Sequence, residues 1–86
     1  MKTFKYVIKD ELGIHARPAA MLASLAKETD SVITISKGEK SVEATKLMMI
    51  MAMGIKCGDE ITVSIEGGTN EDKTYEMVKT FFMDNL

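Results

Sequence analysis

The sequence is poor in several residue types, and each shortage excludes a class of structure or function. Its 86 residues include one cysteine, one histidine, one proline and no tryptophan. The single cysteine, Cys57, cannot form an internal disulfide, and together with one histidine it cannot supply the usual ligand set of a zinc site. We therefore expect neither a structural metal nor a cofactor, and we expect Cys57 to be buried or an inert surface thiol.

Long apolar runs and a strong charge imbalance are also missing. The apolar run Leu47 to Met53 is far shorter than the ~18 residues of a membrane-spanning helix, and the N-terminus lacks the apolar segment and small-residue cleavage site of a secretory signal. The net charge is −2 and the pI is about 5.3, so no basic field would attract nucleic acid. These features predict a cytoplasmic protein without membrane insertion, whose partners are proteins or small molecules.

The apolar patterning predicts one α+β domain over residues 1–86. Period-two alternation predicts strands, helical spacing predicts helices, and glycines separate them. The expected strands are 2–9, 32–37, 40–44 and 61–66, and the expected helices are 16–27, 45–53 and a last one capped by Thr69 or Asn70. The order β-α-β-β-α-β-α predicts a four-stranded antiparallel sheet with three helices on one face and polar residues on the other.

The stretch "GIHARP" contains the only histidine and the only proline. It places His15 at or next to the N-cap of the first helix, where the backbone N–H groups of Ala16 and Arg17 form an anion site. The helix dipole disfavours imidazolium there, and a neutral ring can attack phosphorus. Amide groups and the Arg17 guanidinium would then hold the phosphoryl oxygens.

This motif alone leaves an alternative open, because a lone histidine in a first helical turn is often only a surface or capping residue. The small side chains of Ala16, Ala19 and Ala20 leave room for the active site of another protein. No acid, base or second nucleophile lies beside His15 in the sequence. The fragment therefore indicates a group acceptor rather than a complete active site.

The methionine-rich stretch "LMMIMAM" begins at Leu47. Helical spacing places Ile50 and Met53 toward the core and Leu47, Met48 and Met51 on another face. Methionines can simply fill gaps in a core, but flexible thioethers on an exposed face also suit a surface that binds several proteins. We interpret Leu47, Met48 and Met51 as a docking surface, whereas Met49 has no assigned role.

Two long stretches carry a family resemblance: "GIHARPAAMLA" and "KSVEATKLMMIMAMGIKCGDEITVSIEG". Together they resemble the HPr family, the histidine-containing phosphocarriers of the phosphoenolpyruvate-dependent sugar phosphotransferase system. The resemblance covers nearly the whole chain and implies an open-faced β-sandwich. It also implies that the chain is a phosphoryl carrier, a substrate of its partner phosphotransferases rather than an enzyme, and we expect a monomer.

The resemblance further implies roles for particular residues. His15 would be phosphorylated on Nδ1 by enzyme I, with help from Arg17, and sugar-specific enzyme IIA domains would be the acceptors. The partners would contact Ala16, Ala20 and the Leu47, Met48 and Met51 surface.

One position departs from the family pattern. Many Gram-positive members have a regulatory serine at the start of the second helix, whereas this chain has Lys46, which lacks the acceptor hydroxyl. The neighbouring Thr45 is expected to cap the helix. Two other functions stay open: an HPr-like regulatory or interaction protein not engaged in sugar uptake, and a structural domain with an incidental histidine.

Overall fold

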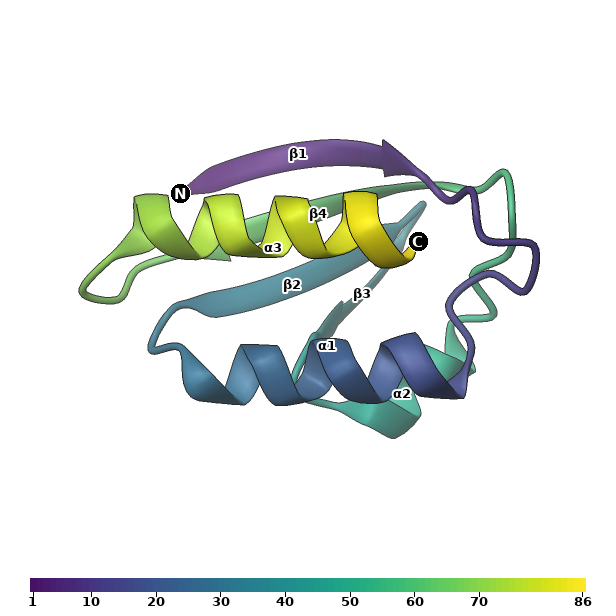
Figure 1. Ribbon diagram of the computed structural model, residues 1–86, viewed down its shortest axis with the longest axis horizontal. Coiled ribbons are helices and arrows are strands. Elements are labelled where there is room, and N and C mark those ends of the chain that lie inside the picture. Colours follow the sequence, from purple (N-terminus) through teal and green to yellow (C-terminus); the bar gives the residue numbers. More distant parts are fainter.

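The computed structural model describes residues 1–86 and contains four strands and three helices (Figure 1). In chain order the elements are β1 (Lys2–Val7), α1 (Ala16–Glu28), β2 (Val32–Lys37), β3 (Lys40–Glu43), α2 (Leu47–Ala52), β4 (Glu60–Glu66) and α3 (Glu71–Asn85). The strands form one antiparallel sheet in the order β1-β4-β2-β3. The predicted fold class and element order are confirmed.

All three helices cover one face of the sheet and leave the other face open (Figure 1). Helix α3 packs on β1 and β4, while α2 packs against β3 and the side of α1. In the central strand β4, Ile61, Val63 and Ile65 point into the buried layer with at most 1% exposure, and the alternate residues are more exposed. The period-two pattern of the sequence therefore assigns the two faces correctly.

Helix α3 provides the largest buried side chain, Phe82. Its ring makes edge-to-face contacts with Phe4 and Tyr6 of β1, at centroid distances of 5.8 and 5.7 Å. The helix is capped by Asn70, whose Oδ1 accepts a hydrogen bond from the N–H of Lys73 at 3.3 Å. Of the two expected caps, Asn70 is thus the one that the structure uses. No helix in the chain combines the length and apolar character needed to cross a membrane.

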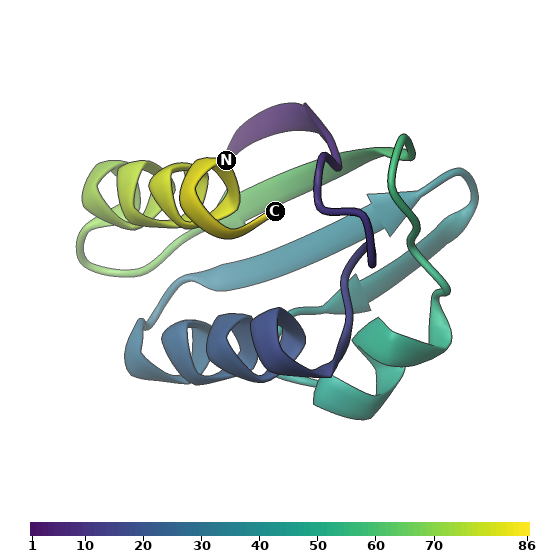
Figure 2. The same ribbon diagram turned by 45° about the vertical axis from the view of Figure 1, so that its right-hand side comes forward.

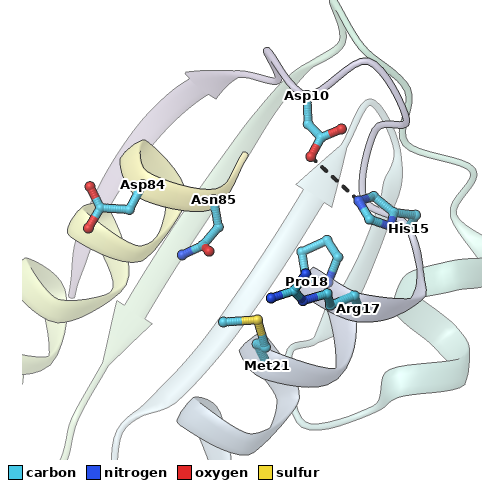
Figure 3. Close-up of a pocket in the computed structure, with 7 residues that line it drawn as sticks. All are labelled: Asp10, His15, Arg17, Pro18, Met21, Asp84 and Asn85. Atoms are coloured by element: carbon cyan, nitrogen blue, oxygen red, sulfur yellow. Dashed lines mark ion pairs between the residues drawn. The ribbon is translucent and has the colours of Figure 1, made fainter.

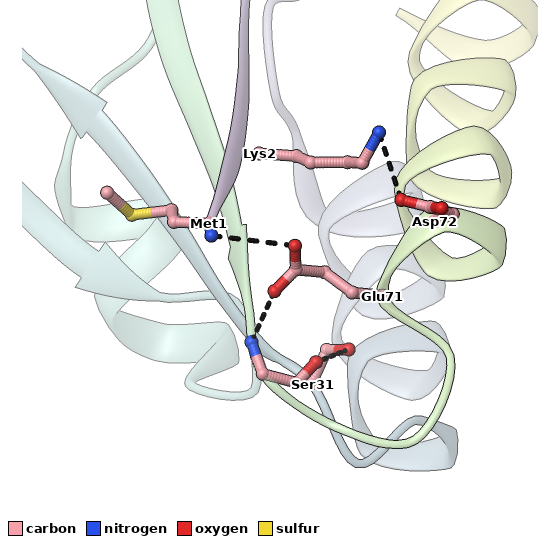
Figure 4. A network of polar contacts seen from close by, with 6 residues as sticks. Met1, Lys2, Ser31, Glu71 and Asp72 are labelled. Carbon is pink, nitrogen blue, oxygen red and sulfur yellow. Dashed lines mark hydrogen bonds and ion pairs between the residues drawn. The ribbon is translucent and has the colours of Figure 1, made fainter.

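A polar network joins the start of edge strand β1 to the start of α3 (Figure 4). The N-terminal amine of Met1 lies 3.5 Å from the Glu71 carboxylate, and Lys2 Nζ lies 2.9 Å from Asp72. The Asp72 carboxylate raises the pKa of Lys2 through a hydrogen bond and its charge. The other Glu71 oxygen accepts a hydrogen bond from the N–H of Gly67 at 2.8 Å, while the Ser31 hydroxyl donates to the Gly67 carbonyl at 2.7 Å. The network closes the loop between β4 and α3.

Two element boundaries differ from the prediction by two residues, and several others differ by one. Strand β1 ends at Val7 rather than at residue 9, because Ile8 bonds instead to the turn before β4: its N–H donates to Asp59 O at 3.0 Å, and its carbonyl accepts from Gly58 N at 2.8 Å. Helix α2 begins at Leu47, after an N-cap at Lys46, and the expected cap at Thr45 was wrong. Thr45 lies in the preceding turn, which the Lys46 N–H closes by donating to Glu43 O at 3.1 Å.

Candidate functional site

The segment between β1 and α1 is held against the turn before β4. Gly13 has a φ of +67°, and a Cβ at this position would lie 2.2 Å from Ile55 O. Only glycine permits both the left-handed conformation and this close approach. The next residue, Ile14, donates its N–H to Ile55 O at 3.1 Å and is buried with 6% exposure. The "GIKCGDE" stretch therefore supports the "GIHARP" stretch directly.

His15 is the N-cap residue of α1, as predicted, but its side chain does not cap the helix. Its N–H donates to Gly13 O and its carbonyl accepts from Ala19 N, at 3.1 and 3.0 Å. The imidazole is therefore left free of helix capping and is 34% exposed. Both the backbone N–H and the backbone carbonyl of His15 are held by hydrogen bonds, so the fold fixes the imidazole at the start of the helix.

Two backbone donors beside His15 have no partner within the chain. The N–H groups of Ala16 and Arg17 take part in no hydrogen bond, and Pro18 has no N–H. Because Ala19 bonds back to His15, these two amides are the free donors at this end of α1. Both residues are exposed, and the Arg17 guanidinium forms no ion pair. The arrangement provides two amides and one permanent positive charge for an anion.

His15 and Arg17 border a shallow hollow between α1 and the end of α3 (Figure 3). The hollow has a volume of about 260 Å³ and is lined by Asp10, His15, Arg17, Pro18, Met21, Asp84 and Asn85. The α3 side of the hollow was not anticipated, because nothing in the sequence links residues 84–85 to the first helix. The Asn85 side chain is tied to its own helix by a hydrogen bond to Phe81 O at 3.0 Å.

Asp10 is the residue that the sequence analysis missed. Its Oδ2 lies 3.4 Å from Nε2 of His15 (Figure 3). Asp10 is five residues from His15 in the sequence, and a turn in which the Gly13 N–H donates to Asp10 O at 2.9 Å brings the two together. Aspartate at the first position of a four-residue turn and glycine at the fourth, here Asp10 and Gly13, are the signal that could have revealed this turn.

The predicted docking surface lies on α2, which is next to the first half of α1 (Figures 1 and 2). Met48 is 75% exposed and Met51 is 41% exposed, whereas Leu47 is partly buried and packs against the core. Ile50 and Met53 are buried, as predicted. Ala16 and Ala20, the other expected contact residues, are exposed on α1.

Three remaining residues of the sequence analysis have clear positions. Met49 is 52% exposed and borders a second hollow, beside Val42 of β3 and away from the His15 site. Cys57 is exposed, and its thiol donates to Lys9 O at 3.7 Å. The side chain of Lys46 makes no capping hydrogen bond at the start of α2. No group of three or more histidine, cysteine, aspartate or glutamate side chains is placed to hold a metal ion.

The fold and site together define a class: small open-faced β-sandwiches with a histidine at the exposed start of the first helix. The chain matches the family model described as the PTS HPr component phosphorylation site over residues 2–84. It is also 39% identical, over 98% of its length and 93% of the relative's, to the phosphocarrier protein HPr of Mycoplasma capricolum. The chain therefore belongs to the HPr family of phosphocarrier proteins, and the resemblance in the sequence is confirmed.

Two solved structures extend the comparison. The first is a histidine-containing phosphocarrier protein, described in a study of the divergence of Mycoplasma from Gram-positive bacteria. It matches this chain with a TM-score of 0.90 and 38% identity, over 96% of this chain and 93% of its own. Crh, the Bacillus subtilis catabolite repression containing protein, has a TM-score of 0.75 and 26% identity, covering 100% of this chain and 98% of its own, and forms a domain-swapped dimer. HPr proteins are carriers rather than catalysts.

Proposed function

We propose that this chain is a cytoplasmic, monomeric phosphoryl carrier that accepts a phosphoryl group on Nδ1 of His15 from phosphorylated enzyme I. It then passes the group to sugar-specific enzyme IIA domains. One observation carries the proposal: the imidazole lies at the start of α1, beside the unpartnered N–H groups of Ala16 and Arg17 and the unpaired guanidinium of Arg17. Each of these groups suits a dianionic phosphoryl group on the ring.

The strength of this anion site suits a carrier. A helix terminus contributes about 0.3–1 kcal/mol to the binding of an anion at an exposed position, and up to ~2 kcal/mol in a partly buried one. Ala16 and Arg17 are exposed residues, so the lower range applies. Such modest stabilisation holds the phosphoryl group without preventing its release to the next acceptor.

The partner proteins would supply the remaining catalytic groups. The hollow beside His15 is open, and its lining has no hydroxyl, thiol or amine nucleophile and no cation other than Arg17. In-line transfer between two proteins requires positioning and charge stabilisation more than covalent chemistry. This chain would thus contribute the acceptor atom and part of the electrostatic field, as a substrate of its partner phosphotransferases.

The partners would dock on the surface formed by Ala16, Ala20, Leu47, Met48 and Met51. Exposed methionines adapt their shape to different binding surfaces. Met48 is exposed over 75% of its surface, while Leu47 anchors α2 to the core. The surface lies next to the site, so one partner can cover both.

Acceptance of the phosphoryl group is tested with phosphoenolpyruvate, magnesium and a cognate enzyme I. We expect intact-protein mass spectrometry to show one acid-labile phosphoryl group, and His15→Ala to show none. Because His15 is the only histidine, loss of the adduct in His15→Ala assigns the phosphoryl group to this ring. Arg17→Lys keeps the positive charge but loses the guanidinium fork, so we expect slower transfer than in the parent protein. An adduct that persists in His15→Ala would refute the proposal.

The docking surface is tested with a matched pair of variants. Met51 on α2 and Met77 on α3 are both 41% exposed, so replacing either with glutamate places a charge in a similar environment. We expect Met51→Glu and Met48→Glu to raise the KM of enzyme I for this chain, and Met77→Glu to leave it unchanged. Equal effects in Met51→Glu and Met77→Glu would remove α2 from the docking surface.

The similarity to Crh favours a second candidate, a regulatory or interaction protein not engaged in sugar uptake. We propose that Lys46 excludes control by serine phosphorylation at this position, because the hydroxyl is absent. Onward transfer to an IIA domain distinguishes the two candidates: a carrier delivers the phosphoryl group, whereas a purely regulatory protein does not. Light scattering tests the monomer against a swapped dimer of the Crh kind.

A further inference from the structure

The carboxylate of Asp10 is held in place from several sides. Its Oδ1 accepts a hydrogen bond from the N–H of Leu12 at 2.9 Å. Its backbone N–H donates to Leu86 O, and its carbonyl accepts from Gly13 N, both at 2.9 Å. These contacts fix the aspartate within the turn that leads to His15. The second carboxylate oxygen, Oδ2, is left pointing toward the imidazole (Figure 3).

Asp10 contacts a particular atom of the imidazole. Its Oδ2 lies 3.4 Å from Nε2, the ring nitrogen that the proposed phosphoryl transfer does not use. This separation is slightly longer than an N–H···O hydrogen bond of ~2.7–3.2 Å, and such contacts often tighten when a catalytic complex forms. The hollow contains a second carboxylate, Asp84, but it forms no ion pair with His15.

We propose that Asp10 is a positioning residue for His15: its carboxylate keeps the single proton of the neutral ring on Nε2 and leaves the lone pair on Nδ1. A carboxylate can only accept a hydrogen bond, so it favours the tautomer whose N–H faces it. The inference rests on the proposed function, since it assigns a purpose to that tautomer. The same orienting role is known for the aspartate of serine protease triads.

The same contact stabilises the product of the transfer. The Nδ1 lone pair forms the new N–P bond, the bond from phosphorus to the donor breaks, and its electron pair leaves with the donor atom. No proton leaves the ring in this step, so the imidazole of His15 becomes positively charged while Nε2 keeps its proton. The nearby Asp10 carboxylate compensates that charge. In the onward step the N–P bond breaks, its electron pair returns to Nδ1, and the ring is again neutral.

Glu11 provides a matched control. It is the next residue along, it carries the same charge, it is exposed, and it makes no ion pair or side-chain hydrogen bond. Replacing Glu11 with glutamine changes the net charge near the site as much as Asp10→Asn does. Asp10→Asn keeps an oxygen that can accept the Leu12 N–H bond, so the turn is preserved, whereas Asp10→Ala removes the side-chain acceptor entirely.

The first measurement is the ¹⁵N chemical shifts of the His15 ring in the unphosphorylated protein, at a pH where the ring is neutral. We expect the Nε2–H tautomer to dominate in the parent protein and in Glu11→Gln. Its population should fall in Asp10→Ala, and it should fall further in Asp10→Asn, because the asparagine NH2 group would face Nε2 as a donor and favour the lone pair on that nitrogen. Equal tautomer populations in the parent protein and Asp10→Ala would overturn the inference.

The second measurement is phosphorylation by enzyme I. We expect Asp10→Ala to lower kcat by roughly 10-fold, the lower end of the effect of carboxylates that orient metal-bound histidines, with little change in KM. Asp10→Glu should recover part of the loss, and Glu11→Gln should match the parent protein. A loss in Glu11→Gln as large as in Asp10→Ala would refute a specific role for Asp10. If the parent protein accepts no phosphoryl group, the proposed function fails, while the ring shifts still decide whether Asp10 sets the tautomer.

Discussion

Replacing Gly13 with alanine tests how the fold supports the histidine. The residue has a φ of +67°, and the left-handed conformation costs an L-residue about 1–2 kcal/mol. The added Cβ would lie 2.2 Å from Ile55 O and 2.8 Å from the Cα of Lys56, so the two backbone segments must separate. Separation breaks the bond from Ile14 N to Ile55 O, and an unsatisfied buried backbone group costs about 1–3 kcal/mol.

The sum is a loss of about 2–5 kcal/mol in the free energy of unfolding. For a domain of this size that corresponds to a Tm lower by roughly 10–30 °C. Gly38 is the matched control, because its φ is +60° and nothing lies within 4 Å of its Cβ position. Gly38→Ala should lose only the part of the stability that comes from the left-handed conformation. Both variants change the entropy of the unfolded chain in the same way, so this effect cancels in the comparison.

Thermal and urea unfolding of the two variants measure the difference directly. We also expect Gly13→Ala, below its Tm, to accept a phosphoryl group more slowly, since a displacement of about 1 Å at a reacting group can lower a rate on the order of 10²-fold. Gly38→Ala should transfer at the parent rate. If Gly13→Ala is no less stable than Gly38→Ala, the argument from close backbone approach is wrong.

Two further predictions concern stability. Phe82→Ala should lower the free energy of unfolding, measured in urea titrations, by about 3–5 kcal/mol, because the ring is fully buried. Phe81 is half-buried, so Phe81→Ala should lower that free energy less, and equal losses in the two variants would contradict the packing account. The Lys37 ammonium, 2.7 Å from Asp59, and the Lys56 N–H lower the pKa of the Asp59 carboxyl. This contribution is present above the unfolded pKa of about 3.9 and is lost as the pH falls through the lower folded value. We therefore expect the urea midpoint to fall less in Lys37→Gln than in the parent protein when the pH is lowered from 5 to 2. An identical fall would refute the assignment of this pH dependence to the Lys37–Asp59 pair.

The regular elements could be predicted because each carries a local signal. Alternation along β4 identifies its buried face, and the helical spacing of Val78 and Phe82 identifies the buried side of α3. The boundaries were less accurate where tertiary bonds replace local ones. Ile8 continues the alternation of β1 but bonds to the turn at Gly58, and Thr45 is a good capping residue that lies one position too early.

The site was predictable in part for the same reason. The placement of His15, Ala16 and Arg17 follows from a helix start, which depends only on neighbouring residues. The end of α3 reaches the site through packing, which no short-range pattern encodes, whereas Asp10 reaches it through a local turn that was overlooked. The "GIKCGDE" stretch likewise resembles the family strongly, but only the structure explains its effect, since Ile55 bonds to the residue before His15.

The central claim is that Nδ1 of His15 carries a phosphoryl group between two proteins. The most direct test is ³¹P and ¹⁵N NMR of the protein after incubation with phosphoenolpyruvate, magnesium and enzyme I, followed by addition of an IIA domain. The account predicts one phosphoryl group bonded to Nδ1 of His15, which disappears from this chain as it is gained by the IIA domain. A phosphoryl group bonded to Nε2, or one that stays on the chain when IIA is added, would contradict it.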